Sequence, residues 1–215
     1  MITEWSFSSD HDGIRQRVKN IIKDNNYTSI DIGAAANFWS YPECKTVADA
    51  VQVNKPDVTQ FKINLEGASN YTELLSYVEK NKKFDFSICS HTLEDIFNPI
   101  DIIKLLQSIS TRGFIALPSK FDEFSYLFEN KYLGNSHHKQ LFDIIDNKVV
   151  IFPKFSFIEV DQRTKEIRER YKGKELYFFW SDSIDYEIFG NGTPFHSDGE
   201  LISTYFAKLN QNIVD

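Results

Sequence analysis

The sequence has 215 residues and a formal net charge of −7, with 41% hydrophobic and 15% aromatic residues. This composition indicates a single globular domain with an ordinary core and excludes a disordered chain. The negative charge argues against nucleic acid as a partner, because phosphate binding needs clustered lysine and arginine. The densest basic stretch, Arg163–Lys174, also holds Glu166 and Glu169, which is typical of a solvated helix face.

Targeting and redox signals are weak throughout the chain. No apolar run approaches the roughly 18 residues that a membrane span needs, and Met1–Asp12 lacks the apolar core of a signal peptide. Cys44 and Cys89 lie far apart with no CxxC motif, which predicts neither a disulfide framework nor a zinc site. We therefore expect a cytoplasmic protein without a membrane partner.

In chain order, the patterns alternate between strand and helix. An amphipathic helix is expected over 13–25, followed by a β-prone run, Tyr27–Ile32, that leads into small residues from Gly33 on. The later expected elements are strands over Lys45–Val53 and Val58–Leu65, a helix over Tyr71–Lys80, a buried strand over Phe84–Cys89, a helix opened by Pro99, and a strand over Phe114–Leu117. This alternation predicts an α/β fold with a mostly parallel sheet and helices on both faces.

The end of the chain departs from that rhythm. Glu175–Trp180 and Ile184–Phe189 are β-rich runs that predict a C-terminal antiparallel hairpin joining the edge of the sheet. The segment before them, Ser119–Lys174, is too long for one crossover helix. We expect it to hold extra helices and to form an acceptor-side insertion within a single domain over residues 1–215.

The turn after the first strand is the first candidate binding site. Open α/β sheets bind ligands at the carboxyl ends of their strands, and small residues such as Gly33 let backbone approach a cofactor closely. Asp49, near the end of the second strand, can accept both hydroxyls of a ribose. A tight structural junction explains the turn equally well when it is taken alone.

Read together, several segments resemble the class I S-adenosylmethionine-dependent methyltransferases. Asp31–Ala35 is similar to their first motif, acidic-x-Gly-x-Gly, and Asp49 matches the acidic residue after strand two. Phe84–Asp95, with its Ser-His-x-Leu-Glu core, is similar to the fourth-strand motif and is the most specific part. The departures are Ala35 for the second glycine, Asn64 for a commoner aspartate, and Asp95 for a common histidine.

The resemblance implies a Rossmann-like sheet, S-adenosylmethionine as cofactor, and methyl transfer to a small polar acceptor with an O- or N-nucleophile, sugars among them. The cofactor-binding residues it implies are Asp31, Gly33, Ala34, Ala35, Asn37, Asp49, Ala50, Asn64, Leu65 and Ser90. Two alternatives remain open. A non-catalytic relative would keep the fold and only bind, and a nicotinamide oxidoreductase is disfavoured because the turn lacks the glycine spacing that pyrophosphate requires.

Histidines supply the candidate catalytic groups. His91 follows the fourth strand, and His137 and His138 lie in the inserted segment. Imidazole titrates near neutral pH and suits a general base, so these are the predicted acceptor-side residues, with a helix-capping role for His91 and a surface loop for His137 and His138 as the alternatives. A metal site built from them with Glu94 and Asp95 has no supporting ligand spacing, so no metal is expected.

Overall fold

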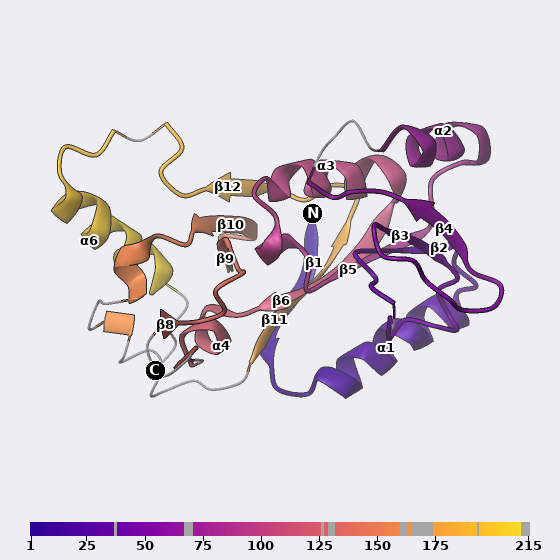
Figure 1. Ribbon diagram of the computed structural model, residues 1–215, viewed down its shortest axis with the longest axis horizontal. Helices are drawn as coiled ribbons and strands as arrows, with labels where there is room; N and C mark the ends of the chain where they lie inside the picture. Colours follow the sequence, from indigo (N-terminus) through magenta and orange to yellow (C-terminus); the bar gives the residue numbers. More distant parts are fainter. Residues whose placement is uncertain are drawn as a thin grey trace.

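The computed structural model describes residues 1–36, 38–66, 71–125, 127–128, 132–159, 163–164, 174–192 and 194–211. A twisted sheet with helices on both faces forms one end of the molecule, and a smaller β layer with a helix extends from it (Figure 1). The α/β class and the mostly parallel sheet that the sequence predicts are therefore confirmed.

The large sheet has seven strands in the order β4-β3-β2-β5-β6-β11-β1. Its strands are β1 (Ile2–Ser8), β2 (Ser29–Ile32), β3 (Thr46–Asp49), β4 (Thr59–Lys62), β5 (Phe86–Ser90), β6 (Arg112–Pro118) and β11 (Glu175–Ser181). Five neighbouring strands, β4, β3, β2, β5 and β6, run parallel to one another. Strand β11 runs antiparallel to both of its neighbours, β6 and β1. The strand order reverses between β2 and β5, which is where this class of sheet opens a crevice for ligands.

Successive side chains along each strand point to opposite faces of the sheet, so both faces are apolar and helices pack on both. The helices with described bounds are α1 (His11–Asp24), α2 (Thr72–Asn81), α3 (Pro99–Ile109), α4 (Lys120–Ser125) and α6 (Asp198–Leu209). On β5, Phe86 and Ile88 pack with the buried stripe of α1, whereas Cys89 belongs to the core beneath α2 and α3. Residues two apart thus share a face, as the pleat of a strand requires.

The predicted strand over 45–53 ends at Asp49, before Val53. The Asp49 carboxylate accepts a hydrogen bond from the backbone N–H of Val51 at 2.7 Å, which turns the chain away from the sheet. Residues 59–62, 86–90 and 112–118 are strands close to where the sequence predicts them.

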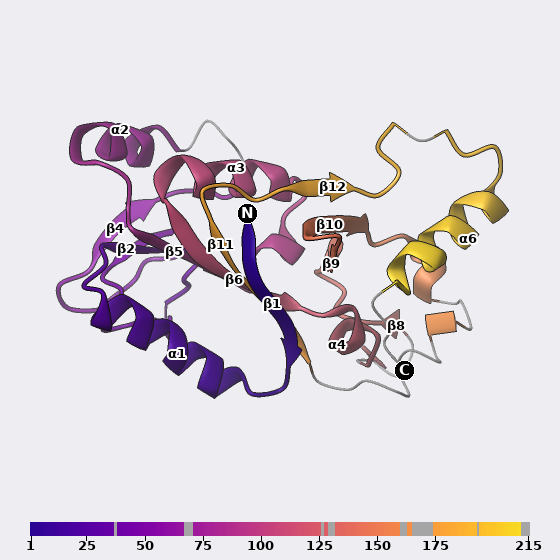
Figure 2. The same ribbon diagram turned by 180° about the vertical axis from the view of Figure 1, so that it is seen from behind.

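The predicted C-terminal hairpin over 175–190 is wrong. Only its first half, β11, enters the large sheet, where β6 and the amino-terminal strand β1 occupy its two edges (Figure 2). The second half, β12 (Tyr186–Ile188), pairs parallel to a strand of a separate sheet. Because β11 has no free edge, a hairpin partner cannot join it there.

The inserted segment is richer in strands than the sequence predicts. It contains β9 (Gln140–Ile145) and β10 (Lys148–Pro153), which form a three-stranded sheet with β12, the short pair β7 (Leu127–Phe128) and β8 (Tyr132–Leu133), and the 3-10 turn Ser156–Glu159. One face of β9 and β10 packs on the core of the large sheet, and the other packs beneath α6. Among the described residues, no helix is both long and apolar enough to cross a bilayer.

Candidate functional site

The carboxyl end of β2 carries a deeply buried carboxylate. Asp31 is 2% exposed, and its Oδ2 accepts a hydrogen bond of 2.6 Å from the Ser40 hydroxyl. Burial, with a further contribution from the nearby Asp49 carboxylate, raises the pKa of Asp31 to about 7, although the Ser40 hydrogen bond opposes the shift. A cation placed here would stabilise the ionised form of this carboxyl group.

The turn after β2 has the backbone geometry of a glycine loop. Gly33 has φ +74°, and a Cβ at this position would lie 2.2 Å from Oγ1 of Thr92. Ala35 also has a left-handed φ, +53°, although it is not glycine. Left-handed backbone costs an L-residue roughly 1–2 kcal/mol, so the fold imposes this conformation on Ala35.

Asp49 joins that turn to the end of β3. Its Oδ2 accepts a hydrogen bond of 2.9 Å from the backbone N–H of Ala35 and its Oδ1 accepts the one from Val51. Each carboxylate oxygen has a second lone pair, so the group can still receive ligand hydroxyls. The structure thus brings the first-motif turn and the predicted ribose-binding acid into direct contact.

The other predicted cofactor residues lie around the same edge. Ala50 is exposed directly after β3, and Ala34 is buried beside Phe38. Asn64 and Leu65 follow β4, with Asn64 exposed, Leu65 half-buried, and Oδ1 of Asn64 accepting a hydrogen bond from the N–H of Glu66 at 3.0 Å. Ser90 ends β5 and is half-buried, whereas Asn37 lies outside the described residues.

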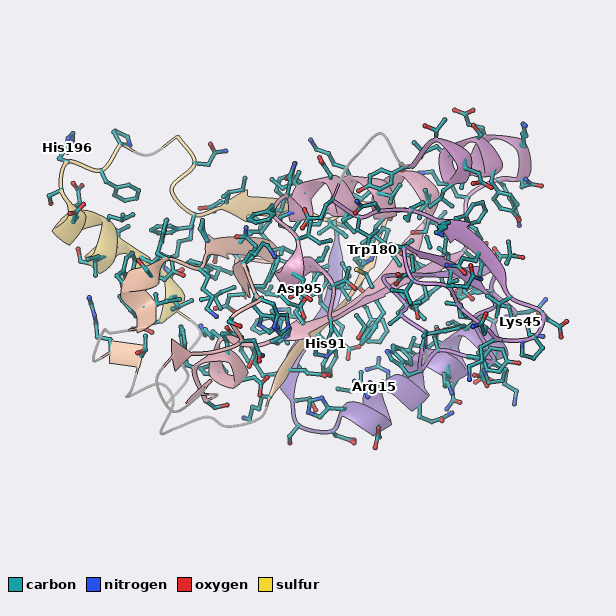
Figure 3. All side chains as sticks on the ribbon, viewed as in Figure 1. Arg15, Lys45, His91, Asp95, Trp180 and His196 are labelled. Carbon is teal, nitrogen blue, oxygen red and sulfur yellow. The ribbon has the colours of Figure 1, made fainter. Side chains whose placement is uncertain are left out.

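His91 directly follows β5 and lies near the middle of the molecule (Figure 3). Its ring lies between two carboxylates. Its Nε2 is 2.5 Å from Oε1 of Glu175, and its Nδ1 is 3.4 Å from Oε1 of Glu94. Burial alone would lower the pKa of His91, but the hydrogen bonds to Glu175 and Glu94 outweigh it and raise the pKa to about 9. This geometry holds an imidazolium at neutral pH, which can donate a hydrogen bond but cannot accept a proton.

Glu175, at the start of β11, is the centre of this network. Its Oε1 also contacts Nδ1 of His11 at 2.7 Å and Nη2 of Arg15 at 3.6 Å, both on α1. Burial by itself would raise the pKa of Glu175, but the His91 and His11 contacts lower it overall. The sequence analysis did not identify Glu175, His11 and Arg15. No local pattern indicates that the start of α1, the start of β11 and the residue after β5 come together in the fold.

His137 and His138 lie on the other side of the same chain turn, Leu93–Asp95. The backbone N–H of Lys139 donates to the carbonyl of Glu94 at 2.7 Å, which fixes the inserted segment against this turn. His138 is buried, and its Nδ1 is 2.6 Å from Oε2 of Glu123, whereas the His137 side chain is 65% exposed. The three predicted histidines therefore gather around the carboxyl end of β5.

Glu123, on α4, is a second buried acid, and no sequence pattern singles it out. It is 1% exposed, contacts Nζ of Lys154 through Oε1, and accepts a hydrogen bond of 3.0 Å from the N–H of Asn135. Burial would raise the pKa of Glu123, but His138 and Lys154 lower it overall. A buried and fully paired carboxylate of this kind orients the groups around it.

Comparison with known proteins gives structural neighbours only. No protein-family model and no curated protein matches the sequence. Among solved structures, the fold is similar to an O-methyltransferase family protein from Burkholderia thailandensis, with 11% identity, 80% of this chain and 57% of that chain covered, and a TM-score of 0.42.

Two further neighbours are enzymes of the same general kind. The plantazolicin methyltransferase BpumL, solved in complex with SAH, is 10% identical over 78% of this chain and 82% of that chain, with a TM-score of 0.42. The methyltransferase domain of bacterial CtHen1 is 10% identical over 78% and 97% of the two chains, with a TM-score of 0.38. The match spans 57% of the length of the Burkholderia protein.

Proposed function

We propose that this protein transfers the methyl group of S-adenosylmethionine to an oxygen or nitrogen of a small polar acceptor, with sugars among the candidate acceptors. The observation that carries the proposal is the contact between the Gly33–Ala35 turn and Asp49, at adjacent strand ends beside the reversal of strand order. The second candidate function is a protein that binds the cofactor without catalysis. It would use the same site, and only a turnover assay distinguishes the two.

The residues present fit the cofactor. Residues Gly33–Ala35 carry no side chain larger than a methyl group, so a ligand can approach the backbone of the turn. Asp49 retains lone pairs for the ribose hydroxyls. Exposed Asn64 would contact the adenine, and Asp31 would stabilise the positive charge of the ligand. When bound, S-adenosylmethionine supplies an electrophilic methyl group on a sulfonium, so the protein's main tasks are alignment and charge complementarity.

The acceptor side is proposed to lie at the ends of β5 and β6, where the three histidines gather. His91 is held as an imidazolium between Glu94 and Glu175, so both of its ring nitrogens already face carboxylates, and the ring would contribute positive charge to the acceptor side. The exposed imidazole of His137 or the ring of His138 would take the acceptor's proton at a ring nitrogen. These roles remain predictions of the proposed function.

Binding of S-adenosylhomocysteine tests the cofactor half of the proposal by titration calorimetry. Asp49→Ala removes two charge-assisted hydrogen bonds to the ribose, each worth about 1.5–3 kcal/mol, so affinity should fall by at least about 100-fold. Asp57→Asn, at an exposed acid of the following loop, is the matched control and should bind normally.

Because Asp49 also holds the Ala35 turn, the fold of the variant must be checked by its circular dichroism and unfolding midpoint. Unchanged affinity in folded Asp49→Ala would place the ribose elsewhere. Tighter binding of NAD than of S-adenosylhomocysteine by the wild-type protein would reject the methyltransferase proposal in favour of an oxidoreductase.

A further inference from the structure

Three side chains of types that bind metal ions, Asp95, His137 and His138, meet beside the Leu93–Asp95 turn. Nε2 of His137 is 3.7 Å from Oδ1 of Asp95, and Nε2 of His138 is 3.9 Å from the same oxygen. One ligand atom from each of the three residues lies within 4.8 Å of the others. Asp95 comes from the end of the β5 motif and the histidines from the insertion, so only the fold brings them together.

Glu123 fixes which nitrogen of His138 faces this cluster. Its Oε2 lies 2.6 Å from Nδ1 of His138, and a carboxylate accepts, so Nδ1 carries the proton. In the neutral imidazole, Nε2 is then the unprotonated nitrogen, and it faces Asp95. A buried carboxylate that orients the far nitrogen of an imidazole is the usual support of a metal-ligating histidine, because it fixes the tautomer and raises ligand basicity.

Oδ1 of Asp95, the oxygen at the centre of the cluster, lacks a hydrogen bond within the described part of the chain. Oδ1 is buried from solvent and accepts none from the residues that the structure describes. The separations of 3.7 and 3.9 Å to the imidazoles are too long for hydrogen bonds. An acceptor oxygen that faces an acceptor nitrogen, with no proton at bonding distance, is stabilised when a cation lies between them.

The spacing suits one ion. Ligand bonds of about 2.0–2.2 Å in a tetrahedral site place neighbouring donors roughly 3.4 Å apart. The two distances to Asp95 Oδ1, 3.7 and 3.9 Å, exceed this by a few tenths of an ångström, and the ligand atoms of the two histidines lie within 4.8 Å of each other. Rotation of exposed His137 and half-exposed Asp95 would bring the three groups onto one ion. The same exposure leaves a path by which an ion can enter, while buried His138 anchors the site.

We propose that Asp95, His137 and His138 bind a divalent transition-metal ion of the Zn²⁺ or Mn²⁺ kind. Two imidazoles and one carboxylate favour such ions over Ca²⁺ and Mg²⁺, which prefer oxygen ligands alone. Three protein ligands leave at least one coordination position open, as in sites where a metal binds substrate or water. The inference does not depend on methyl transfer; if both hold, the ion replaces a histidine base as the group that activates the acceptor oxygen.

Metal binding by the untagged, chelator-treated protein is the test, using Zn²⁺ in titration calorimetry and Co²⁺ in visible absorption at pH 8. We expect one ion per chain, with binding at least ten-fold weaker in Asp95→Asn and in His137→Ala. Both substitutions are at solvent-accessible side chains, so the fold should survive them. Glu123→Gln should weaken binding by about 10–100-fold while leaving the ligands in place.

His196→Ala is the matched control, because His196 is exposed and lies at the far end of the molecule (Figure 3). It should keep the wild-type affinity for Zn²⁺ and the wild-type Co²⁺ spectrum. Absence of one-to-one binding by the wild-type protein would overturn the proposal. Equal affinity in wild type, Asp95→Asn and His137→Ala would also overturn it, since the ion would then lie elsewhere.

Discussion

At the scale of single residues, the most unusual group is His91. It has a left-handed backbone, φ +50°, and its ring contacts both Glu94 and Glu175. The same network contains His11 and Arg15, which face Glu175, and the partly buried Asp122. A histidine held in this conformation between two acids couples the stability of the fold to pH.

The sign of that coupling follows from the direction of the pKa shift. The folded pKa of His91 is about 9, above its ordinary value of 6.5, so the stabilisation is complete below pH 6.5 and is lost as pH rises through 9. The shift corresponds to about 3 kcal/mol before screening. Because the side chain is 38% exposed, we expect about 1–2 kcal/mol.

Urea unfolding at pH 6, 7.5 and 9 measures this prediction. His91→Asn removes the imidazole but tolerates left-handed backbone, so it should lower the free energy of unfolding at pH 6 and flatten its decline toward pH 9. His196→Asn, at an exposed histidine, should keep the wild-type profile. An equally steep decline in His91→Asn would assign the pH dependence to other groups.

At the scale of elements, one buried ion pair joins three of them. Nζ of Lys120 on α4 lies 2.6 Å from Oδ2 of Asp143 on β9, and both side chains are 0% exposed. Nζ also donates to the carbonyl of Leu209 at the end of α6. Burial lowers the pKa of Lys120, although Asp143 opposes the shift.

Removing one partner would leave an uncompensated buried charge. We therefore expect Lys120→Ala to lower the free energy of unfolding by about 3–5 kcal/mol. Lys104→Ala, at an exposed lysine on α3, should change it by no more than about 0.5 kcal/mol. Chemical denaturation at neutral pH compares the two variants, and a loss under 1 kcal/mol in Lys120→Ala would show that the pair does not hold α4, β9 and α6 together.

At the scale of the whole molecule, the β9–β10 layer belongs to two cores at once. Ile144 and Val149 pack in the core of the large sheet, and Val150 and Phe152 pack beneath α6. Strands buried on both faces transmit disruption from one core to the other. The two ends of the molecule should therefore unfold as one cooperative unit.

Tryptophan fluorescence can test that cooperativity, because Trp5, Trp39 and Trp180 all lie in or beside the large sheet. Phe152→Ala, at a fully buried site in the other core, should cost about 3–5 kcal/mol. If unfolding is cooperative, the fluorescence and circular dichroism midpoints fall together. A biphasic dichroism curve with an unmoved fluorescence transition would instead divide the chain into two folding units.

Local patterns determined the parallel half of this fold. Helical periodicity and short apolar runs bounded by Gly33, Pro56 and Pro99 predict the elements from α1 to β6, because burial on one stripe or on both faces leaves a direct record in residue order. The hairpin formed by β9 and β10, which the sequence analysis did not predict, also has a local signal. Asp146 and Asn147, both with positive φ, form the tight turn between β9 and β10.

Edge pairing and side-chain clustering were decided only by tertiary structure. Which strand occupies the free edge of β11 depends on competition between the 184–189 run and β1, and no local pattern ranks the two. Glu175 beside His91, and Glu123 behind His138, join residues 84 and 15 positions apart in the chain. The sequence by itself therefore determined the parallel strands and the expectation of a cofactor at their carboxyl ends, whereas the ionic networks around His91 and His138 follow from how β11 and the insertion pack beside β5.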